Sequence, residues 1–342
     1  ISGWKAGIIF DMKVSELGEF GLIDLIAGII GRPEGDSLLI GIGDDAAVWS
    51  VEGGLQLSTI DSLIEGVHFA LATTSWRDLG WKSLAVNLSD IAAMGGRPRY
   101  ALVSLGLPGD TDVESVVDFY HGMIELARRF DVQIAGGDTV GAPEVVINVT
   151  ATGEARDENS IMTRSAAKPG DAIAVTGSLG ASAAGLAMIR QELSFDAETT
   201  SVLRAAHTKP NPRVTEGLTL ARHGVKAAMD ISDGLAGDLE KLCKASGVSA
   251  RIYAERIPIH PAVRRSLGDE ALELALSGGE DYELLFTAPA KIIGDIEGET
   301  VCPVTIIGEI VTGAGISILD ADGNEIPLGE EGWDHFSAGK RI

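Results

Sequence analysis

Aspartates that follow glycine-rich or strand-like stretches recur along this chain. The first such stretch, 41–69, opens with Gly-Ile-Gly and Asp44-Asp45, and its strand-like run ends at Asp61. Adjacent carboxylates repel one another unless a cation lies between them, and oxygen ligands of this kind suit a hard divalent ion such as Mg²⁺. A lone Gly-Asp-Asp is usually a solvated turn, but its recurrence favours a metal site. Carboxylates follow similar stretches at Asp90, Asp138, Asp230, Asp233 and Glu280.

A long, mostly apolar helix is predicted over 76–94 and is closed by a Gly-Gly pair. Ser83, Asn87 and Asp90 fall on one face of it, because they are spaced i, i+4 and i+7. Such a stripe is either a solvated face or a buried one that needs polar partners, and the spacing leaves both open. Asp90 lies near the helix C-terminus, where the macrodipole disfavours a carboxylate. A bound metal ion would offset that cost.

The remaining pattern predicts a mixed α/β chain of two domains. A polar stretch at 154–160 lacks periodicity, so we divide the chain into an N-terminal extension (1–13), a first domain (14–155) and a second domain (156–342). Further helices are predicted at 15–29, at 112–130 and from the N-cap Ser232 to about 245. Strands are predicted at 38–42, 48–51, 55–59, 100–107, 133–135, 145–153, 172–176, 226–231, 306–310 and 316–319, with glycine-rich corners at 136–139 and 276–286.

A loop of small residues, 177–185, leads into another helix. The N-terminus of a helix is a general anion site, although tight packing of a strand against a helix explains such a loop equally well. No Gly-Lys-Ser/Thr follows, so the loop is not a Walker A loop. It also departs from the Gly-x-Gly-x-x-Gly dinucleotide pattern.

Composition excludes several classes of function. The chain of 342 residues carries a formal net charge of −23. It therefore lacks the basic stripe that binding to nucleic acid or to an anionic membrane requires. No apolar run approaches the roughly 18–20 residues of a membrane span. Cys243 and Cys302 are far apart and in no Cys-x-x-Cys motif, which argues against a structural zinc site and fits a reducing cytoplasm.

A series of motifs, in order, resembles the thiamine-monophosphate kinase family, within the superfamily that includes phosphoribosylaminoimidazole synthetase. Each motif is weak alone, but their order is specific, and together they cover the chain from about Val14 onward. That superfamily has no P-loop, in agreement with the missing Walker lysine. The motifs are ELGEFGLI, GIGDDAAV, DSLIEGVHF, AVNLSDIAAMGGRP, IAGGDT, TRSAAKPGD, DISDGLAGDL, SGGEDYEL and GWDHF.

The resemblance implies transfer of the γ-phosphoryl group of ATP to thiamine monophosphate, assisted by several Mg²⁺ ions, to give thiamine diphosphate and ADP. It also implies a two-domain phosphoribosylaminoimidazole synthetase-like fold. The N-terminal sheet would pair with that of a second subunit to form a barrel across a homodimer. The C-terminal α/β domain would pack beside it, with ATP and substrate in the cleft.

Roles for individual residues follow from the matching motif positions. The metal ligands would be Asp45, Asp61, Asp90, Asp138 and Asp230, with Asp233 as a further ligand. Thr59 and Ile60 stand where the family usually has two hydroxyl residues that approach metal, and Ile60 leaves only its backbone carbonyl for this role. Nucleotide contacts would come from Tyr120, Gly137, Asp138, Arg164 and Ser232, and the thiamine end would contact His68, Glu280 and Trp333.

The chemistry of the acceptor agrees with a site rich in aspartate and without a catalytic base. A phosphate monoester is already anionic at neutral pH, so metal ions and in-line positioning supply most of what the transfer needs. His68 then orients substrate, or else is a hydrogen-bonded histidine beside Phe69. Trp333 either anchors the C-terminal tail or offers its ring to the cationic thiazolium.

Other function classes fit the sequence less well. A selenophosphate synthetase would need a reactive cysteine near its N-terminus, and none precedes Cys243. A hydrogenase-maturation relative would be expected to end in cysteine, whereas this chain ends in Lys-Arg-Ile. Phosphoribosylaminoimidazole synthetase itself is disfavoured by GVHF and GWDHF. A non-catalytic nucleotide sensor would be expected to have lost several of the acidic corners.

Overall fold

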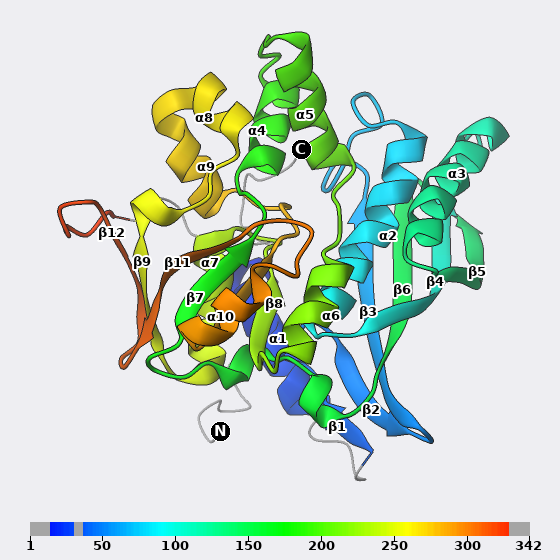
Figure 1. Cartoon of the computed structure of the whole chain (residues 1–342). Coiled ribbons are helices and arrows are strands. Elements are labelled where there is room, and N and C mark those ends of the chain that lie inside the picture. Colours follow the sequence, from blue (N-terminus) through cyan, green and yellow to red (C-terminus); the bar gives the residue numbers. More distant parts are fainter. Residues whose placement is uncertain (1–13, 31–36, 328–342) are drawn as a thin grey trace.

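The chain forms two six-stranded sheets with one long helix, α2 (Trp76–Ala93), between them. The computed structural model describes residues 14–30 and 37–327. The helix packs on strands of the first sheet and also contacts a strand and two helices of the second half. Most of its side chains are buried for this reason. The helix α1 (Val14–Ile30) precedes the first sheet (Figure 1).

The first sheet has the order β1-β2-β3-β6-β4-β5, and all neighbours are antiparallel except the parallel pair β4 and β5. The helix α2 packs on β3, β4 and β6, and α3 (Val113–Arg129) lies against α2. The strands are β1 (Leu38–Ile40), β2 (Ala47–Val51), β3 (Gly54–Ile64), β4 (Arg97–Leu107), β5 (Gln133–Gly141) and β6 (Val146–Ala155).

The second sheet has the order β12-β9-β11-β7-β10-β8, with only β9 and β12 parallel. Its strands are β7 (Ala172–Thr176), β8 (Ala227–Asp230), β9 (Ser249–Tyr253), β10 (Leu284–Ala288), β11 (Val304–Val311) and β12 (Gly315–Leu319). Its helices are α4 (Ala181–Arg190), α5 (Ala197–Thr208), α6 (Val214–Arg222), α7 (Leu235–Ser246), α8 (Pro261–Leu267), α9 (Ala271–Ser277) and α10 (Ala290–Ile296).

The two faces of β3 differ in character. Leu55, Leu57 and Leu63 are buried, so alternate residues of this strand face α2. Thr59 and Asp61 share that inner face by the same alternation. The neighbouring even-numbered residues point the other way, and 64% of the Ile60 surface is exposed. The strand therefore carries two polar side chains toward the end of α2.

The glycine corner predicted at 136–139 is wrong, because β5 continues through it to Gly141 after a shift in register between Ile134 and Gly136. Gly136 and Gly137 pair in register with Leu102 and Val103 of β4. A Cβ atom on Gly137 would lie 1.7 Å from the carbonyl oxygen of Val103. The glycines allow two strands to approach closely and do not form a turn. A glycine pair has the same appearance in the sequence in either case. The strand β3 is also longer than predicted, because β6 pairs with it as far as Ile64.

The predicted N-cap Ser232 is also wrong, since α7 begins after Gly234. Asp238, inside the first turn, turns its carboxylate back toward the preceding loop. Its Oδ2 accepts the backbone N–H groups of Ser232, Asp233 and Gly234 at 3.0–3.2 Å. A side chain from within the helix thus satisfies donors that an N-cap hydroxyl would otherwise serve.

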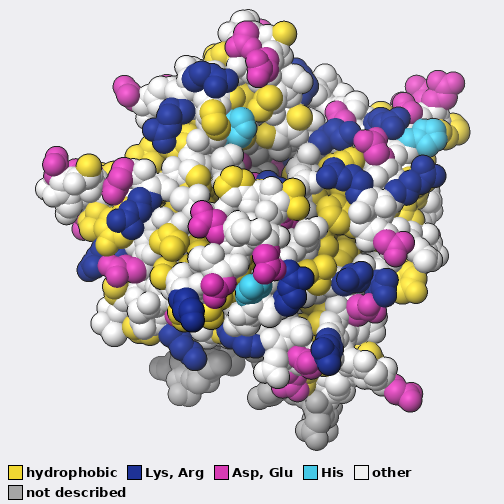
Figure 2. Space-filling model, viewed as in Figure 1, with side chains coloured by type: hydrophobic (Ala, Val, Ile, Leu, Met, Phe, Trp, Pro, Cys, Tyr) yellow, Lys and Arg dark blue, Asp and Glu magenta, His cyan; other side chains and the backbone are white. Residues whose placement is uncertain are grey.

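Neither sheet closes into a barrel within the described residues, since the first ends at β1 and β5 and the second at β12 and β8. A barrel across a dimer, as the family resemblance implies, would require a second chain. Acidic and basic side chains are interspersed over the face seen in Figure 2. Among the described helices, none has the length and apolarity needed to cross a membrane.

The helices α2 and α3 approach closely through two glycines. A Cβ atom on Gly80 would lie 1.8 Å from the carbonyl oxygen of Phe119, and one on Gly122 would lie 1.7 Å from that of Arg77. No side chain fits at either contact. The two helices are therefore held at a distance that fixes where α2 lies over the sheet.

This contact gives a direct test of the packing. Gly80→Ala should lower the free energy of unfolding by about 1–3 kcal/mol or more, because the added methyl group forces α2 and α3 apart. Gly294→Ala is the matched control: Gly294 lies in α10 with nothing within 4 Å of its would-be Cβ. That change should stabilise by roughly 0.5–1 kcal/mol through helix propensity. Equal stabilisation of both variants in denaturant unfolding would contradict the close approach.

Candidate active site

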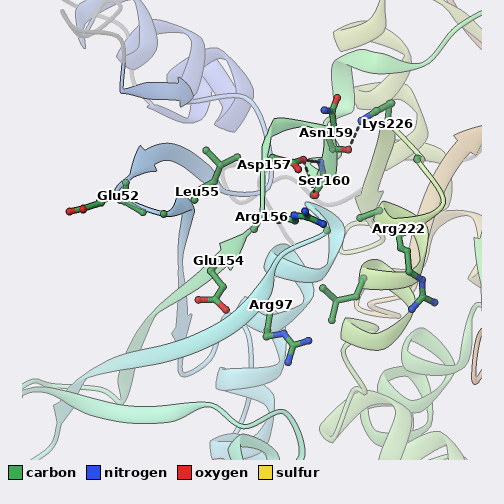
Figure 3. A pocket seen from close by; sticks show the side chains of 18 residues that line it. Glu52, Leu55, Arg97, Glu154, Arg156, Asp157, Asn159, Ser160, Arg222 and Lys226 are labelled. Atoms are coloured by element: carbon green, nitrogen blue, oxygen red, sulfur yellow. Dashed lines mark hydrogen bonds between the residues drawn. The ribbon is translucent and has the colours of Figure 1, made fainter.

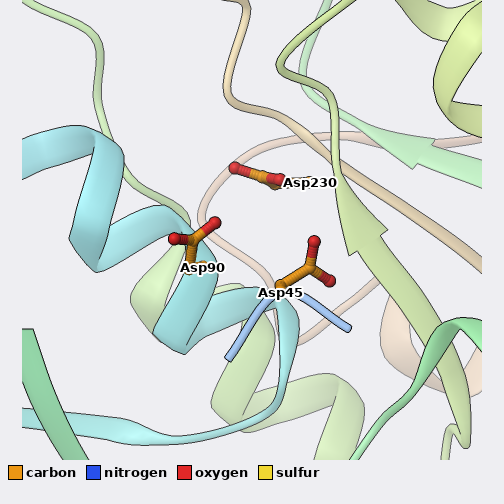
Figure 4. A group of neighbouring side chains, drawn as sticks. All are labelled: Asp45, Asp90 and Asp230. Carbon is orange, nitrogen blue, oxygen red and sulfur yellow. The ribbon is translucent and has the colours of Figure 1, made fainter. Parts of the chain in front are cut away.

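Three buried or half-buried carboxylates meet where α2 ends. One oxygen of each of Asp45, Asp90 and Asp230 lies within 4.8 Å of the others, and Figure 4 shows the three groups turned toward a common space. Asp61 adjoins them, because its carboxyl group contacts that of Asp90. The tertiary structure thus brings together four of the predicted metal ligands.

Each of the four carboxylates comes from a different element. Asp45 lies in the loop between β1 and β2, and Asp61 lies on the inner face of β3. Asp90 is in the last turn of α2, and Asp230 ends β8. Since α2 packs against β3 on one side and β8 on the other, its last turn is where both sheets contribute a side chain.

Hydroxyl groups hold two of these carboxylates in place. Thr59 Oγ1 donates to Asp90 Oδ2 at 2.5 Å, and Ser89 Oγ donates to Asp230 Oδ2 at 2.6 Å. The second oxygen of Asp45 is buried and has no hydrogen-bond donor among the described residues. Leaving such an oxygen unpaired costs free energy, which a cation would recover.

Burial and mutual repulsion raise the pKa values of these carboxyl groups. Burial, with the charge of Asp45, raises the pKa of Asp61 to about 6. The pKa of Asp90 lies well above its ordinary range, first because the group is buried and then because Asp61, Asp230 and Asp45 surround it. Burial and Asp45 likewise raise the pKa of Asp230. A hard divalent cation would remove this repulsion, so the residues present fit Mg²⁺.

Arg164 is the cation nearest to this cluster. Its guanidinium forms an ion pair with Asp45, and its backbone N–H donates to Asp44 Oδ1 at 2.7 Å. Although burial opposes the ionisation of Asp45, Arg164 favours it. The Nε of Arg164 is buried and has no acceptor among the described residues. That donor is available to an anionic ligand beside the carboxylates.

The polar stripe on α2 is buried rather than solvated. Ser83 and Asn87 are no more than 1% exposed. Ser83 Oγ donates to the Gly80 carbonyl at 3.1 Å, and Asn87 Nδ2 donates to the Ser83 carbonyl at 3.1 Å. Asn87 Oδ1 has no donor among the described residues. Asn87, one turn before Asp90, is thus a second buried residue with an unpaired acceptor.

The loop after β8 carries a second group of charges. Asp233 forms an ion pair with Lys241, which also lies 2.8 Å from Asp238. The carboxylate of Asp233, predicted as a further metal ligand, is thus paired with a lysine. Ser232 faces the same loop, and its carbonyl oxygen accepts the Glu280 N–H at 2.7 Å.

Glu280 lies in the corner between α9 and β10 and is held by two cationic or polar partners. Lys82 Nζ lies 2.7 Å from its Oε1, and His207 Nδ1 lies 3.3 Å from its Oε2. The backbone of Glu280 is in the left-handed region, with φ of 66°. The two hydrogen bonds from Glu280 and Tyr282 to Ser232 and Ile231 fix this corner against the loop that follows Asp230.

Other predicted residues lie apart from the carboxylate cluster. Asp138 is exposed on the edge strand β5 and accepts the Thr139 N–H at 2.9 Å. It shares a row of the sheet with Ser104 and Asn148, on the face opposite to Asp61. A single chain does not bring Asp138 to the other aspartates.

The predicted nucleotide and thiamine contacts are dispersed. Tyr120 lies half-buried on α3, with its ring edge-on to Phe119 at 5.4 Å. His68 follows β3, and its Nδ1 accepts the Ile64 N–H at 3.0 Å, which leaves Nε2 to carry the proton of the neutral ring. Trp333 lies outside the described residues.

Three residues that the sequence did not single out join this region. Lys82 lies in the apolar helix one position before the polar stripe. A lysine among apolar residues could have indicated a buried ion pair from the sequence alone. His207 and Asp238 had no comparable signal. Their partners lie far away in the sequence or, for Asp238, in a loop whose conformation the sequence did not reveal.

A separate cavity of about 810 Å³ lies between the β2–β3 hairpin, the end of β6 and α6. Figure 3 shows the side chains that line it, among them Arg97, Arg156 and Lys226. None of the predicted site residues is part of its lining. The cavity is therefore distinct from the carboxylate cluster.

The chain is similar in sequence and in fold to known proteins. The family described as AIR synthase related protein matches through its N-terminal domain over residues 43–155 and its C-terminal domain over 168–320. The thiamine-monophosphate kinase of Bacillus subtilis is 38% identical over 92% of this chain and 98% of its own length. That of Escherichia coli K12 is 39% identical over 94% and 98%. The solved structure of AaThiL complexed with AMPPCP and TMP is 35% identical, has a TM-score of 0.84, and is covered over 95% of this chain and 99% of its own.

The carboxylate cluster predicts how the protein responds to a metal ion. At neutral pH, Asp90→Asn should leave the stability of the metal-free protein level or higher, since one of several repelling charges is lost. Saturating Mg²⁺ should stabilise the unaltered protein by up to about 2.7 kcal/mol at a hundred times Kd, and the variant by much less. Thermal unfolding with and without Mg²⁺ measures both effects.

The control for this experiment is Asp295→Asn, which removes an exposed carboxylate of α10. It should keep the full response to Mg²⁺. If Mg²⁺ stabilises Asp90→Asn as strongly as the unaltered chain, the cluster does not bind the ion.

Proposed function

The chain belongs to the thiamine-monophosphate kinases within the AIR synthase related protein family, and we propose how its residues carry out that reaction. The enzyme transfers a phosphoryl group from ATP to thiamine monophosphate, giving thiamine diphosphate and ADP. The observation that carries the residue assignment is the convergence of Asp45, Asp90 and Asp230 from both halves of the chain. Both free cysteines suit a reducing cytoplasm, where we place the enzyme.

Mg²⁺ is the proposed cofactor at this cluster. When held by these carboxylates, it would supply the positive charge that offsets repulsion between the phosphate groups of donor and acceptor. The unpaired oxygen of Asp45 and the raised pKa values of its neighbours support the assignment. The proposed ligands are Asp45, Asp61, Asp90 and Asp230, with Asp138, Asp233, the Thr59 hydroxyl and the Ile60 carbonyl as further candidates.

The nucleotide is proposed to lie beside Arg164. The unpaired Nε of Arg164 can donate a hydrogen bond to a phosphate oxygen next to the carboxylate cluster. Ser232 follows Asp230 by two positions, and we assign it a nucleotide contact on its motif position. Gly137, Asp138 and Tyr120 remain proposed nucleotide contacts on motif position alone, since the single chain places them on β5 and α3.

The thiamine end of the substrate is assigned to His68, Glu280 and Trp333. Glu280 supports this best, because its backbone is hydrogen-bonded to Ser232, two residues after the proposed ligand Asp230. The residues proposed to bind the phosphate and those proposed to bind the ring would therefore be held at a fixed distance from one another. His68 would orient the substrate rather than accept a proton.

No residue is needed as a general base. The acceptor oxygen of a phosphate monoester is already anionic at neutral pH. The work of the protein is to hold two polyanions in line and to exclude competing geometry. Buried aspartates, fixed by hydroxyl donors from Thr59 and Ser89, are suited to that task.

The functional unit is proposed to be a homodimer formed through the first sheet. The outer face of this sheet exposes Ile60, Tyr100, Leu102 and Val140, which are 50–64% accessible. Large apolar side chains exposed on a sheet face of this kind support an interface there. We propose that two such faces form the barrel, and that the domain division falls after β6, which ends at Ala155.

The reaction itself is testable with purified protein, ATP and Mg²⁺. Thiamine monophosphate should be converted to thiamine diphosphate, whereas free thiamine should have a kcat/KM at least about 100-fold lower, because its hydroxyl would need a base that the site lacks. Product analysis by chromatography distinguishes the two. Asp90→Asn is the inactive control. Efficient diphosphate formation from free thiamine would count against the proposed mechanism.

The dimer is testable by light scattering at micromolar concentration. The unaltered protein should have about twice the chain mass of 35.7 kDa. Leu102→Asp should shift it toward the monomer, since it places a charge in the middle of the apolar face. Val113→Asp is the control, because Val113 is 78% exposed at the start of α3 and away from that face. A dimer that tolerates Leu102→Asp would exclude this face as the interface.

A further inference from the structure

A buried ion network lies beside the carboxylate cluster and joins three elements. Lys82 of α2 and His207 of α5 both contact Glu280, at 2.7 Å and 3.3 Å. The side chains of Lys82 and His207 are 2% and 6% exposed, whereas that of Glu280 is 25% exposed. The network is thus closed on the side of its two donors and open on the side of the carboxylate.

Burying the charged side chain of Lys82 in α2 costs free energy. It lies in the middle of a helix whose neighbouring side chains are buried, and an unpaired ammonium there costs several kcal/mol. Among the described residues, its only ion-pair partner is Glu280. A well-packed apolar residue would usually be as stable at such a position, so the packing of α2 does not by itself explain a lysine.

The two donors differ in charge. Burial and the neighbouring Lys82 lower the pKa of His207, so the imidazole is neutral and donates one N–H. Ser182 Oγ lies 3.4 Å from the same Nδ1 and helps to orient the ring. Although burial opposes ionisation of Glu280, Lys82 and His207 outweigh it and lower its pKa to about 2. The ammonium of Lys82 therefore balances the carboxylate charge of Glu280.

The network is also fixed relative to the proposed metal ligands. Lys82 and Asp90 lie eight positions apart on α2, a rise of about 12 Å along a rigid helix. From the other side, the Glu280 N–H donates to the Ser232 carbonyl at 2.7 Å, and the Tyr282 N–H donates to that of Ile231 at 2.9 Å. The Glu280 carboxylate therefore keeps a constant place with respect to both Asp90 and Asp230.

We propose that Lys82 and His207 are positioning residues that present the Glu280 carboxylate to the organic part of the substrate. The inference rests on the proposed function, in which Glu280 contacts the thiamine end. Because Lys82 already balances its charge, Glu280 acts as a directional hydrogen-bond acceptor. It suits the N–H donors of the aminopyrimidine ring better than the delocalised charge of the thiazolium.

Steady-state kinetics with each substrate varied separately tests this. Lys82→Met and His207→Leu should raise the KM for thiamine monophosphate about 10- to 100-fold, the effect of a lost hydrogen bond to a charged group. The KM for ATP should stay within about twofold. His207→Asn retains a donor near the Nδ1 position and should recover part of the loss. Lys209→Met, which removes a lysine that pairs with Glu125 at 3.3 Å, is the control and should change neither KM.

The double variant Lys82→Met/Glu280→Gln separates positioning from stability. Lys82→Met leaves a partly buried carboxylate with one neutral donor, so the melting temperature of this variant should fall. Removing both charges should restore stability toward the unaltered value but leave the KM for thiamine monophosphate high. If Lys82→Met does not fold, the KM for thiamine monophosphate is compared instead among the double variant, His207→Leu and His207→Asn.

The outcomes distinguish this inference from the assignment beneath it. If Glu280→Gln raises the KM for thiamine monophosphate while Lys82→Met and His207→Leu leave it unchanged, the two donors are only structural and the inference is overturned. If Glu280→Gln also leaves it unchanged, the assignment of Glu280 to the substrate fails. An analogue with an oxo group in place of the pyrimidine amino group should bind the unaltered enzyme more weakly, and equal binding would overturn the hydrogen-bond role.

Discussion

Mutual repulsion among buried carboxylates is the constraint on which the rest of this structure depends. Asp45, Asp61, Asp90 and Asp230 come together in a space from which water is largely excluded, and each group's pKa rises as a result. A fold that only needed stability would place apolar side chains there. The surrounding structure instead supplies hydroxyl donors, one arginine and an unpaired carboxylate oxygen. A cation bound among these groups would relieve their repulsion.

The helix α2 makes this arrangement possible. It carries Asp90 at its end and Lys82 in its middle, and it contacts both sheets. Two glycine contacts bring it close against α3. A phosphate-binding end and a ring-binding end on one rigid helix would set the length of the substrate that the site accepts. Phosphoryl transfer between two polyanions depends on such positioning more than on proton transfer.

The corner at 279–283 connects the second half to the same helix. Glu280 contacts Lys82, Asp281 accepts the backbone N–H groups of Gly180 and Ser182, and Glu283 pairs with Arg213. Successive acidic side chains thus face α2, the start of α4 and the segment before α6. Of these contacts, the ion pair of Glu280 with Lys82 joins the corner to the first half of the chain.

The sequence by itself determined the element order, the acidic character of the site and the family, because motifs and periodicity are local properties. It also predicted the ranges of α2 and β4 correctly to within a few residues. Only the tertiary structure decided whether the stripe at Ser83, Asn87 and Asp90 is solvated or buried, since burial depends on what packs against the helix. It likewise showed that Gly137 belongs to a strand, because a glycine that turns and a glycine that permits close approach look alike in sequence. Lys82, His207 and Asp238 escaped notice for the same reason: their roles lie in partners that distant segments or folded loops bring within hydrogen-bonding distance.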